Sequence, residues 1–262
     1  MRIGCTTDFA DASRIEAIAK AGYDYVEISL NRFTFADDEV YRNLLSYLDR
    51  AGIPCETANC LFPGDIKLCG EQYDPAKVKE YLTKAFERIR GVGIDVIVFG
   101  SGTSRKIPDG FPREKAMEQL RDVCAGILEP LCDKYGVRIA IEPLRSEETN
   151  VFNTVSEVNS FVKEIALPHV KCLADNYHMA QENEPYTDIR AVGEDLIHAH
   201  IANPDGRWCP TLADSHDYSE FFASLKAIGY TGRLSVEAGI PKDVPEYLAI
   251  ADTAKFLRAC IL

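Results

Sequence analysis

The sequence predicts an α/β protein, a single (β/α)₈ TIM barrel of parallel strands that takes up residues 1–262 as one domain. The chain has 262 residues, close to the size at which one such barrel is complete. Short β-like runs alternate with segments of helical periodicity, which is the pattern of parallel strands joined by crossover helices. No linker, low-complexity tract or change of composition divides the chain.

The expected strands are short apolar runs bounded by turn residues. Eight such runs occur, and eight units favour a closed barrel over an open doubly wound sheet. They are Arg2–Cys5, Tyr25–Ser29, Pro54–Ala58, Val96–Gly100, Arg138–Glu142, Val170–Asp175, Ile197–Ile201 and Leu234–Glu237.

The expected helices lie between these runs and carry start and stop signals. Asp11 can cap the first helix and Gly22 can end it, Asp74 and Pro75 open a later helix, and Gly229 follows the helix before the last strand. Segments with helical periodicity include Asp11–Ala21, Pro75–Gly91, Arg113–Tyr135, Thr154–Ile165 and Tyr218–Ile228.

Composition narrows the class of ligand. The formal net charge is −12, which argues against nucleic acid as a partner because phosphate binding needs a basic face.

The N-terminus lacks the apolar core of a signal peptide, and no stretch is long enough to span a bilayer. The nine cysteines include no CxxC pair, so we expect reduced core thiols and a cytoplasmic location. The sequence leaves open a homodimer or a homotetramer.

Side chains of metal-binding types end the last four expected strands. Because functional groups of a parallel barrel gather where the strands end, we expect these side chains to meet at one mouth. Three converging carboxylates would repel one another, and a divalent cation resolves that repulsion. Carboxylate oxygens with one imidazole nitrogen suit Mn²⁺ best, with Co²⁺ and Mg²⁺ as alternatives. The four residues are Glu142, Asp175, His200 and Glu237.

The two glutamate strands share a pattern, Arg-x-small-x-Glu. Residues two apart in a strand share a face, so Ala140 lies beneath Glu142 and Ser235 beneath Glu237. A small residue at that place leaves room for a buried carboxylate and its ligand.

Four stretches together resemble a known family. They are IEPLRSEETNVFNT from Ile141, LADNYHM from Leu173, HAHIANPDGR from His198 and LSVEAG from Leu234. In these the chain is similar to the xylose-isomerase-like TIM-barrel superfamily and, within it, to the sugar-phosphate isomerase/epimerase family of the D-tagatose/D-psicose 3-epimerase type. The resemblance runs along essentially the whole chain.

The resemblance implies a role for each matching residue. Glu142 and Glu237 would bind the metal and act as the catalytic acid/base pair, and Asp175 and His200 would complete the metal site. The residues implied as substrate contacts are Glu148, His178 and Arg207. From the residues alone, Glu148 equally fits a salt bridge with Arg145, Arg207 a solvated loop cation, and His178 a supporting rim histidine.

The implied function is metal-dependent isomerisation or epimerisation of a ketose or keto-sugar. The cation would stabilise the enediolate formed when a C–H next to the carbonyl is deprotonated. Return of the proton to the opposite face of the same carbon is epimerisation, and return to the neighbouring carbon is isomerisation. General acid/base help contributes about 10²–10⁴-fold.

Two departures from the family pattern concern the substrate. Pro143-Leu144-Arg145-Ser146 stands where these epimerases usually have an Asn-Arg-Phe run, and the loop to Arg207 is one residue longer. A hydroxypyruvate isomerase-like enzyme, a keto-glycoside-processing enzyme and a non-catalytic sugar-binding subunit stay open as alternatives. Few basic residues lie near the site, which favours an unphosphorylated sugar.

Four further polar residues lie near the expected strand ends or in adjoining loops. Glu27 lies at the end of the second strand, and the sequence favours neither direction of its side chain, into the pocket or away from it. Arg105 follows a glycine-rich turn and could reach a substrate oxygen or a phosphate. His198 supports His200 from one layer below, and His216 is expected to cap a helix.

Overall fold

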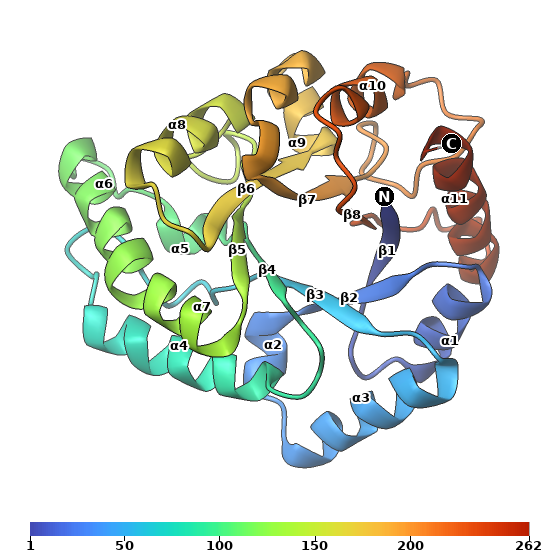
Figure 1. Ribbon diagram of the computed structural model, residues 1–262, viewed down its shortest axis with the longest axis horizontal. Helices are drawn as coiled ribbons and strands as arrows, with labels where there is room; N and C mark the ends of the chain where they lie inside the picture. The colour runs from blue at the N-terminus through green and yellow to red at the C-terminus, as the bar shows by residue number, and fades with distance from the viewer. Residues whose placement is uncertain (262) are drawn as a thin grey trace.

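The computed structural model describes residues 1–261, and they form a closed barrel of parallel strands in the order β1 to β8, surrounded by helices (Figure 1). This confirms the predicted fold. The strands are β1 (Arg2–Thr7), β2 (Tyr25–Ser29), β3 (Cys55–Asn59), β4 (Val96–Phe99), β5 (Arg138–Ile141), β6 (Val170–Asp175), β7 (Leu196–Ile201) and β8 (Arg233–Val236).

The helices cover the outside of the barrel. They are α1 (Ala12–Lys20), α2 (Leu30–Thr34), α3 (Asp38–Ala51), α4 (Pro75–Ile89), α5 (Gly102–Arg105), α6 (Arg113–Asp122), α7 (Glu129–Tyr135), α8 (Val155–Ile165), α9 (Asn176–Gln181), α10 (Ser219–Ala227) and α11 (Glu246–Ile261). Short 3₁₀ turns, η2 (Tyr186–Ala191) and η3 (Gly193–Asp195), lead into β7. Among the described residues, no helix combines the length and the apolarity that crossing a membrane requires.

The predicted helix caps are present. The Asp11 carboxylate accepts the N–H of Arg14 at 3.0 Å, and Asp74 accepts the N–H of Ala76 at 2.9 Å. The expected helix 113–135 is interrupted by a π-helical turn, η1 (Val123–Leu128). Pro130 follows that turn within α7 and has no N–H for the carbonyl four residues earlier, so the helix widens there.

Apolar side chains fill two separate spaces. The larger core lies between the strands and the helices. A small cluster, formed by Val96, Val98, Ala140, Leu173 and Ile197, is distinct from it. Because neighbours of Val96, Val98 and Ala140 along their strands belong to the larger core, we place this cluster inside the barrel.

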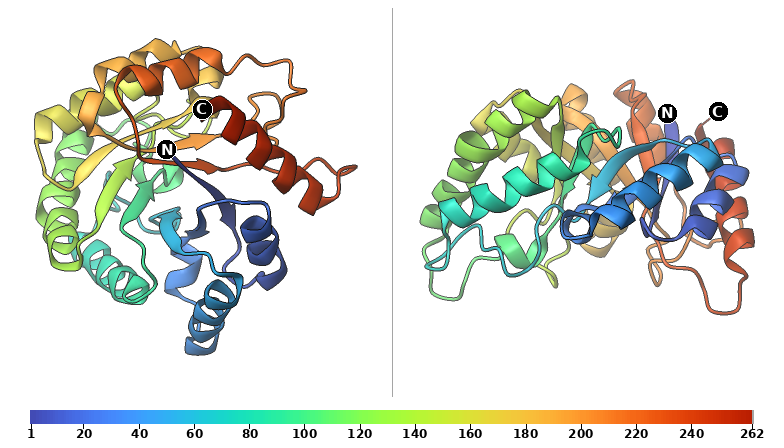
Figure 2. Two further views of the ribbon diagram at one scale, coloured as in Figure 1. Left: turned by 45° about the vertical axis from the view of Figure 1, so that its right-hand side comes forward. Right: turned by 90° about the horizontal axis from the view of Figure 1, so that it is seen from below.

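The functional face is opposite the chain ends. In the right-hand view of Figure 2, β1 begins and α11 ends at the upper edge of the barrel. The carboxyl ends of the parallel strands therefore point to the other edge, where the βα loops gather. All nine cysteines are unpaired, and most of them are buried, as expected of core thiols.

Candidate active site at the carboxyl ends of the strands

The four residues expected as metal ligands meet at the mouth of the barrel. Each offers one ligand atom, and these atoms all lie within 4.8 Å of one another. Asp175 ends β6 and pairs in register with His200 of β7. Glu142 and Glu237 follow β5 and β8 by one residue, and their N–H groups still donate to the carbonyls of Phe99 and Ile201 on the neighbouring strands β4 and β7.

Glu27 and the site carboxylates fix the His200 ring from both sides. Its Nδ1 lies 2.9 Å from Glu142 Oε1 and 3.5 Å from Glu237 Oε2. Its Nε2 lies 2.9 Å from Glu27 Oε1. One ring nitrogen is therefore aimed into the carboxylate cluster while the other is held by a buried carboxylate, the usual arrangement of a metal-binding histidine.

Glu27 is fully buried beneath the cluster. Its Oε2 accepts the hydroxyls of Thr57 and Ser235, each at 2.7 Å, and lies 2.9 Å from His198 Nε2. Glu27 thus faces the barrel interior, and His198 supports His200 both through Glu27 and by edge-to-face contact of the two rings, whose centroids are 4.9 Å apart. Ser235, expected to leave space, also takes part in this network.

The charges in the cluster are strongly coupled. Burial and the neighbouring Glu237 raise the pKa of Glu142, although His200 opposes them. Burial alone would also raise the pKa of Glu237, but His200 and Arg207 outweigh it and lower the pKa to about 2. Burial would lower the pKa of His200, yet the surrounding carboxylates, first among them Glu27, raise it well above its usual value.

The donor set fits a divalent cation. Three carboxylates and one imidazole nitrogen converge, and like charges at this range need a positive charge among them. Oxygen donors with a single nitrogen suit a moderately hard ion such as Mn²⁺, Co²⁺ or Mg²⁺.

Asp175 uses its two oxygens differently. Oδ1 accepts the N–H of Tyr177 at 2.8 Å and so caps α9. Oδ2 faces the site, 3.6 Å from His178 Nε2 and 3.9 Å from Arg207 Nη2. The helix cap therefore fixes the carboxylate whose second oxygen is available as a ligand.

His178 presents a free donor to the site. Its Nδ1 accepts the N–H of Arg145 at 3.2 Å, which places the ring proton on Nε2. That Nε2 is buried without a hydrogen-bond partner in the described chain. His178 and Glu142 both line a cavity at the mouth of the barrel, which we call the inner cavity. An unpaired buried N–H aimed into a cavity is suited to a substrate oxygen.

Glu237 is held by two donors. Arg207 Nη2 and Asn59 Nδ2 each approach one of its carboxylate oxygens at 2.6 Å. Arg207 has a positive φ of 56°, and its guanidinium lies over the ring of Tyr177. Asn59 was missed because the expected third strand stopped at Ala58, one residue before the residue that faces the site.

Glu148 forms the salt bridge with Arg145 and also lies in the expected substrate site, the two roles that the sequence allowed. Its Oε1 accepts Arg145 Nε at 2.8 Å, and the residue also lines the inner cavity. This cavity has a volume of about 330 Å³ and contains Glu142, His178, Arg207 and Glu237 in its lining. The structure therefore brings the three expected substrate contacts together with both expected acid/base residues.

The family model described as xylose isomerase-like TIM barrel matches residues 15–260. The chain belongs to that family. The predicted class of enzyme, a sugar epimerase or isomerase, is confirmed by the chain's relatives.

Two relatives and one solved structure illustrate the similarity. An L-ribulose 3-epimerase of Methylomonas sp. (strain DH-1) is 30% identical over 86% of this chain and 77% of its own. A 3-dehydro-D-guloside 4-epimerase of Escherichia coli (strain K12) is 27% identical over 93% of this chain and 92% of its own. A D-psicose 3-epimerase crystallised in the presence of D-fructose superposes with a TM-score of 0.83 at 20% identity, over 100% of this chain and 99% of that one.

In this xylose isomerase-like barrel, Arg105 does not reach a substrate, contrary to expectation. The side chain is fully buried, and it donates to the carbonyls of Phe99 at 2.9 Å and Glu142 at 2.7 Å. Its guanidinium lies between the rings of Phe99 and Phe152. Burial lowers its pKa to about 10. Arg105 therefore fixes the main chain that carries Glu142.

His216 does not cap a helix, which corrects a second expectation. Its Nε2 lies 2.9 Å from the hydroxyl of Tyr186. The neighbouring Asp217 accepts the N–H of Ser219 at the start of α10 instead, since a carboxylate one residue closer to the helix reaches that N–H.

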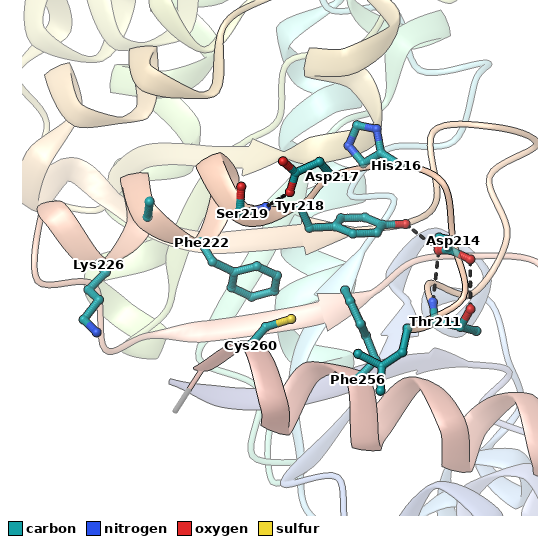
Figure 3. A pocket seen from close by; sticks show the side chains of 12 residues that line it. Thr211, Asp214, His216, Asp217, Tyr218, Ser219, Phe222, Lys226, Phe256 and Cys260 are labelled. Atoms are coloured by element: carbon teal, nitrogen blue, oxygen red, sulfur yellow. Dashed lines mark hydrogen bonds between the residues drawn. The ribbon is translucent and has the colours of Figure 1, made fainter.

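Another cavity lies outside the barrel, between α10 and α11 (Figure 3). It has a volume of about 480 Å³. The Tyr218 hydroxyl donates to Asp214 at 2.7 Å, and Asp214 also accepts the N–H of Thr211 at 3.0 Å. Because these polar groups satisfy one another away from the strand ends, the chemistry belongs to the mouth of the barrel.

Proposed function

We propose that this enzyme epimerises an unphosphorylated keto-sugar at the carbon next to its carbonyl, by proton transfer between Glu142, the substrate and Glu237. The observation that carries the proposal is the convergence of four ligand types beside an unpaired His178 Nε2 in one cavity. Isomerisation would use the same groups, with the proton returned to the neighbouring carbon.

A single divalent cation, Mn²⁺ in the first place and Co²⁺ or Mg²⁺ as alternatives, would sit among Glu142, Asp175, His200 and Glu237 and supply Lewis-acid polarisation of the carbonyl. The protein's own side chains position the substrate and transfer the proton. Glu142 and Glu237 come from β5 and β8, which are separated by β6 and β7, so their carboxylates enter the cavity from two sides.

The two glutamates differ in how they are held. Arg207 and Asn59 fix Glu237 through both oxygens, whereas Glu142 hydrogen-bonds to His200 through one oxygen. One carboxylate removes the substrate proton, and the other returns a proton to the opposite face. His178 Nε2–H and Arg207 would hold substrate oxygens as negative charge develops, and Glu148 would fix a hydroxyl.

A glycoside of a keto-sugar is the second candidate substrate. The relative from Escherichia coli is named as an epimerase of a 3-dehydro-D-guloside, and this chain matches it over nearly its whole length. The L-ribulose 3-epimerase is matched over 77% of its length, and its name points to a free ketose. Both substrates place a hydroxyl-bearing carbon beside a carbonyl.

The domain organisation, location and assembly of the enzyme are also part of the proposal. We expect residues 1–262 to be one domain of a cytoplasmic enzyme that assembles as a homodimer or homotetramer and does not bind nucleic acid or membranes. The acidic net charge of −12 supports the absence of a nucleic-acid partner.

Deuterium incorporation from D₂O with added Mn²⁺ tests the function. Exchange at the carbon next to the carbonyl, in a panel of free ketoses and 3-keto-sugars, is the expected result. Glu142→Gln and Glu237→Gln should each lower exchange by at least about 10²-fold while the melting temperature stays close to the wild-type value, because each amide cannot accept the proton. Undiminished exchange in both variants would overturn the assignment.

A further inference from the structure

A larger cavity adjoins the inner one at the mouth of the barrel. The outer cavity has a volume of about 620 Å³, compared with about 330 Å³ for the inner cavity. Cys60, Arg207 and Glu237 line both, so the two cavities meet at an acid/base residue. The outer cavity extends over the ends of β1 and β2, and nothing in the proton-transfer scheme uses it.

Paired polar groups form its wall. Arg32 Nη2 pairs with Asp8 Oδ2 at 2.9 Å, and the Arg32 side chain is 63% exposed to the cavity and solvent. Arg14 pairs with Glu246 and also donates to the carbonyl of Thr6. The Arg14 side chain is only 16% exposed, so its position is set before a ligand arrives. Paired and oriented donors and acceptors of this kind suit hydroxyl groups, which both donate and accept.

The balance of charge excludes a strongly ionic ligand. Opposite charges nearly cancel, and no aromatic ring among the described residues lines the outer cavity. A phosphate would need uncompensated cations, and an apolar group would leave the charged wall unsatisfied. The charged lining residues are Arg14, Arg32, Arg207, Asp8, Asp11, Glu237 and Glu246.

The sizes of the two cavities point to a substrate of two parts. Small-molecule sites span about 300–1,000 Å³. The inner cavity lies at the lower end of this range and suits one sugar ring, whereas the two cavities together approach the upper end. A free ketose would leave the outer cavity without a function in binding.

We propose that the outer cavity is a subsite for a neutral, hydroxyl-rich substituent, so that the preferred substrate is a keto-sugar joined through a glycosidic bond to a second sugar. The keto-sugar ring lies beside Glu142 and Glu237, and the second sugar contacts Arg32 and Asp8. This inference rests on the proposed function, because it assigns the reacting ring to the inner cavity.

The test compares three forms of one 3-keto-hexose with the wild-type enzyme and Mn²⁺. These are the free sugar, its methyl glycoside, and its glycoside with a second hexose. Deuterium exchange should show a kcat/KM for the hexosyl glycoside at least about tenfold above that for the methyl glycoside, the effect of one or two hydrogen bonds to charged groups. The variant Arg32→Ala should remove most of that ratio.

Arg42→Ala is the matched control. Arg42 is an exposed arginine on α3 outside the outer cavity, and its replacement should keep the tenfold ratio. Equal kcat/KM for the methyl and hexosyl glycosides would overturn the subsite, as would an Arg32→Ala ratio equal to the wild-type ratio. If deuterium exchanged into none of the three forms and into no free ketose, the proposed function would be overturned, and the subsite with it.

Discussion

Replacing Glu27 with glutamine tests how the metal-facing nitrogen of His200 is kept available. Glu27 Oε2 receives three donors, from Thr57, Ser235 and His198, while Oε1 receives only His200. A glutamine has one acceptor oxygen, and three donors outweigh one, so its oxygen should stay on the Oε2 side. Its NH₂ group would then face His200 Nε2 and donate to it.

The consequence is a change of tautomer. If His200 Nε2 accepts a proton from the amide, the neutral ring carries its own proton on Nδ1, the atom 2.9 Å from Glu142 Oε1. A cation must then displace that proton. Loss of a buried partner of a metal-binding histidine costs about 10–100-fold in metal affinity, which corresponds to about 1.4–2.8 kcal/mol.

The loss of Mn²⁺ affinity is measured by titrating each protein with Mn²⁺ and monitoring binding by calorimetry or by the spectrum of the unbound ion. Thr57→Val is the matched control, because it removes one donor from the same carboxylate but leaves the acceptor for His200 intact. Its affinity should fall by less than that of Glu27→Gln. Equal Mn²⁺ affinity in the wild-type protein and Glu27→Gln, with unchanged melting temperatures, would show that Glu27 does not set the tautomer of His200.

Three further predictions concern other contacts. Asn59→Ala should lower kcat/KM by about tenfold, because Glu237 loses one of its two fixed donors. Arg105→Met should lower the melting temperature by roughly 10 °C, since two buried carbonyls lose their donor at a cost of about 2–4 kcal/mol. Burial alone would raise the pKa of Asp24, but Arg258 and the backbone N–H of Ile3 lower it below the usual value of an aspartate. Asp24→Asn should therefore destabilise the protein by about 1 kcal/mol at neutral pH, and the difference should vanish as the pH falls through the lowered pKa.

Each of these has an outcome that contradicts it. Steady-state kinetics showing a wild-type kcat/KM for Asn59→Ala would mean that Arg207 alone fixes Glu237. A melting curve for Arg105→Met that coincides with the wild-type curve would remove the structural role given to that arginine. For Asp24→Asn, an unfolding free energy difference that persists at a pH well below the lowered pKa of Asp24 would show that the carboxylate's charge is not its source.

The strand ends allowed the ligand set to be predicted from sequence. Parallel strands must end at one face, so Glu142, Asp175, His200 and Glu237 had to come near one another once the strands were located. The prediction needed only strand positions accurate to about one residue. Indeed β5 and β8 stop one residue before their glutamates, without consequence for the site.

Residues whose roles depend on packing were harder to predict. Glu27 lies where the register of β2 and β3 shifts, so alternation along the strand could not decide its direction. Arg105 is charged and follows a loop, yet the carbonyls of Phe99 and Glu142 draw it into the interior. The outer cavity is lined by residues from the ends of β1, β2 and β3, from α1 and α2, and from the loops after β7 and β8, which no local pattern connects.

The central claim is that one cation is bound jointly by the four strand-end residues. Anomalous diffraction at the manganese absorption edge, from crystals grown with Mn²⁺, measures this most directly. We expect one strong peak, bonded to His200 Nδ1 and to carboxylate oxygens of Glu142, Asp175 and Glu237. A peak among Glu27, His198 and His200 instead, or none at the mouth of the barrel, would contradict it.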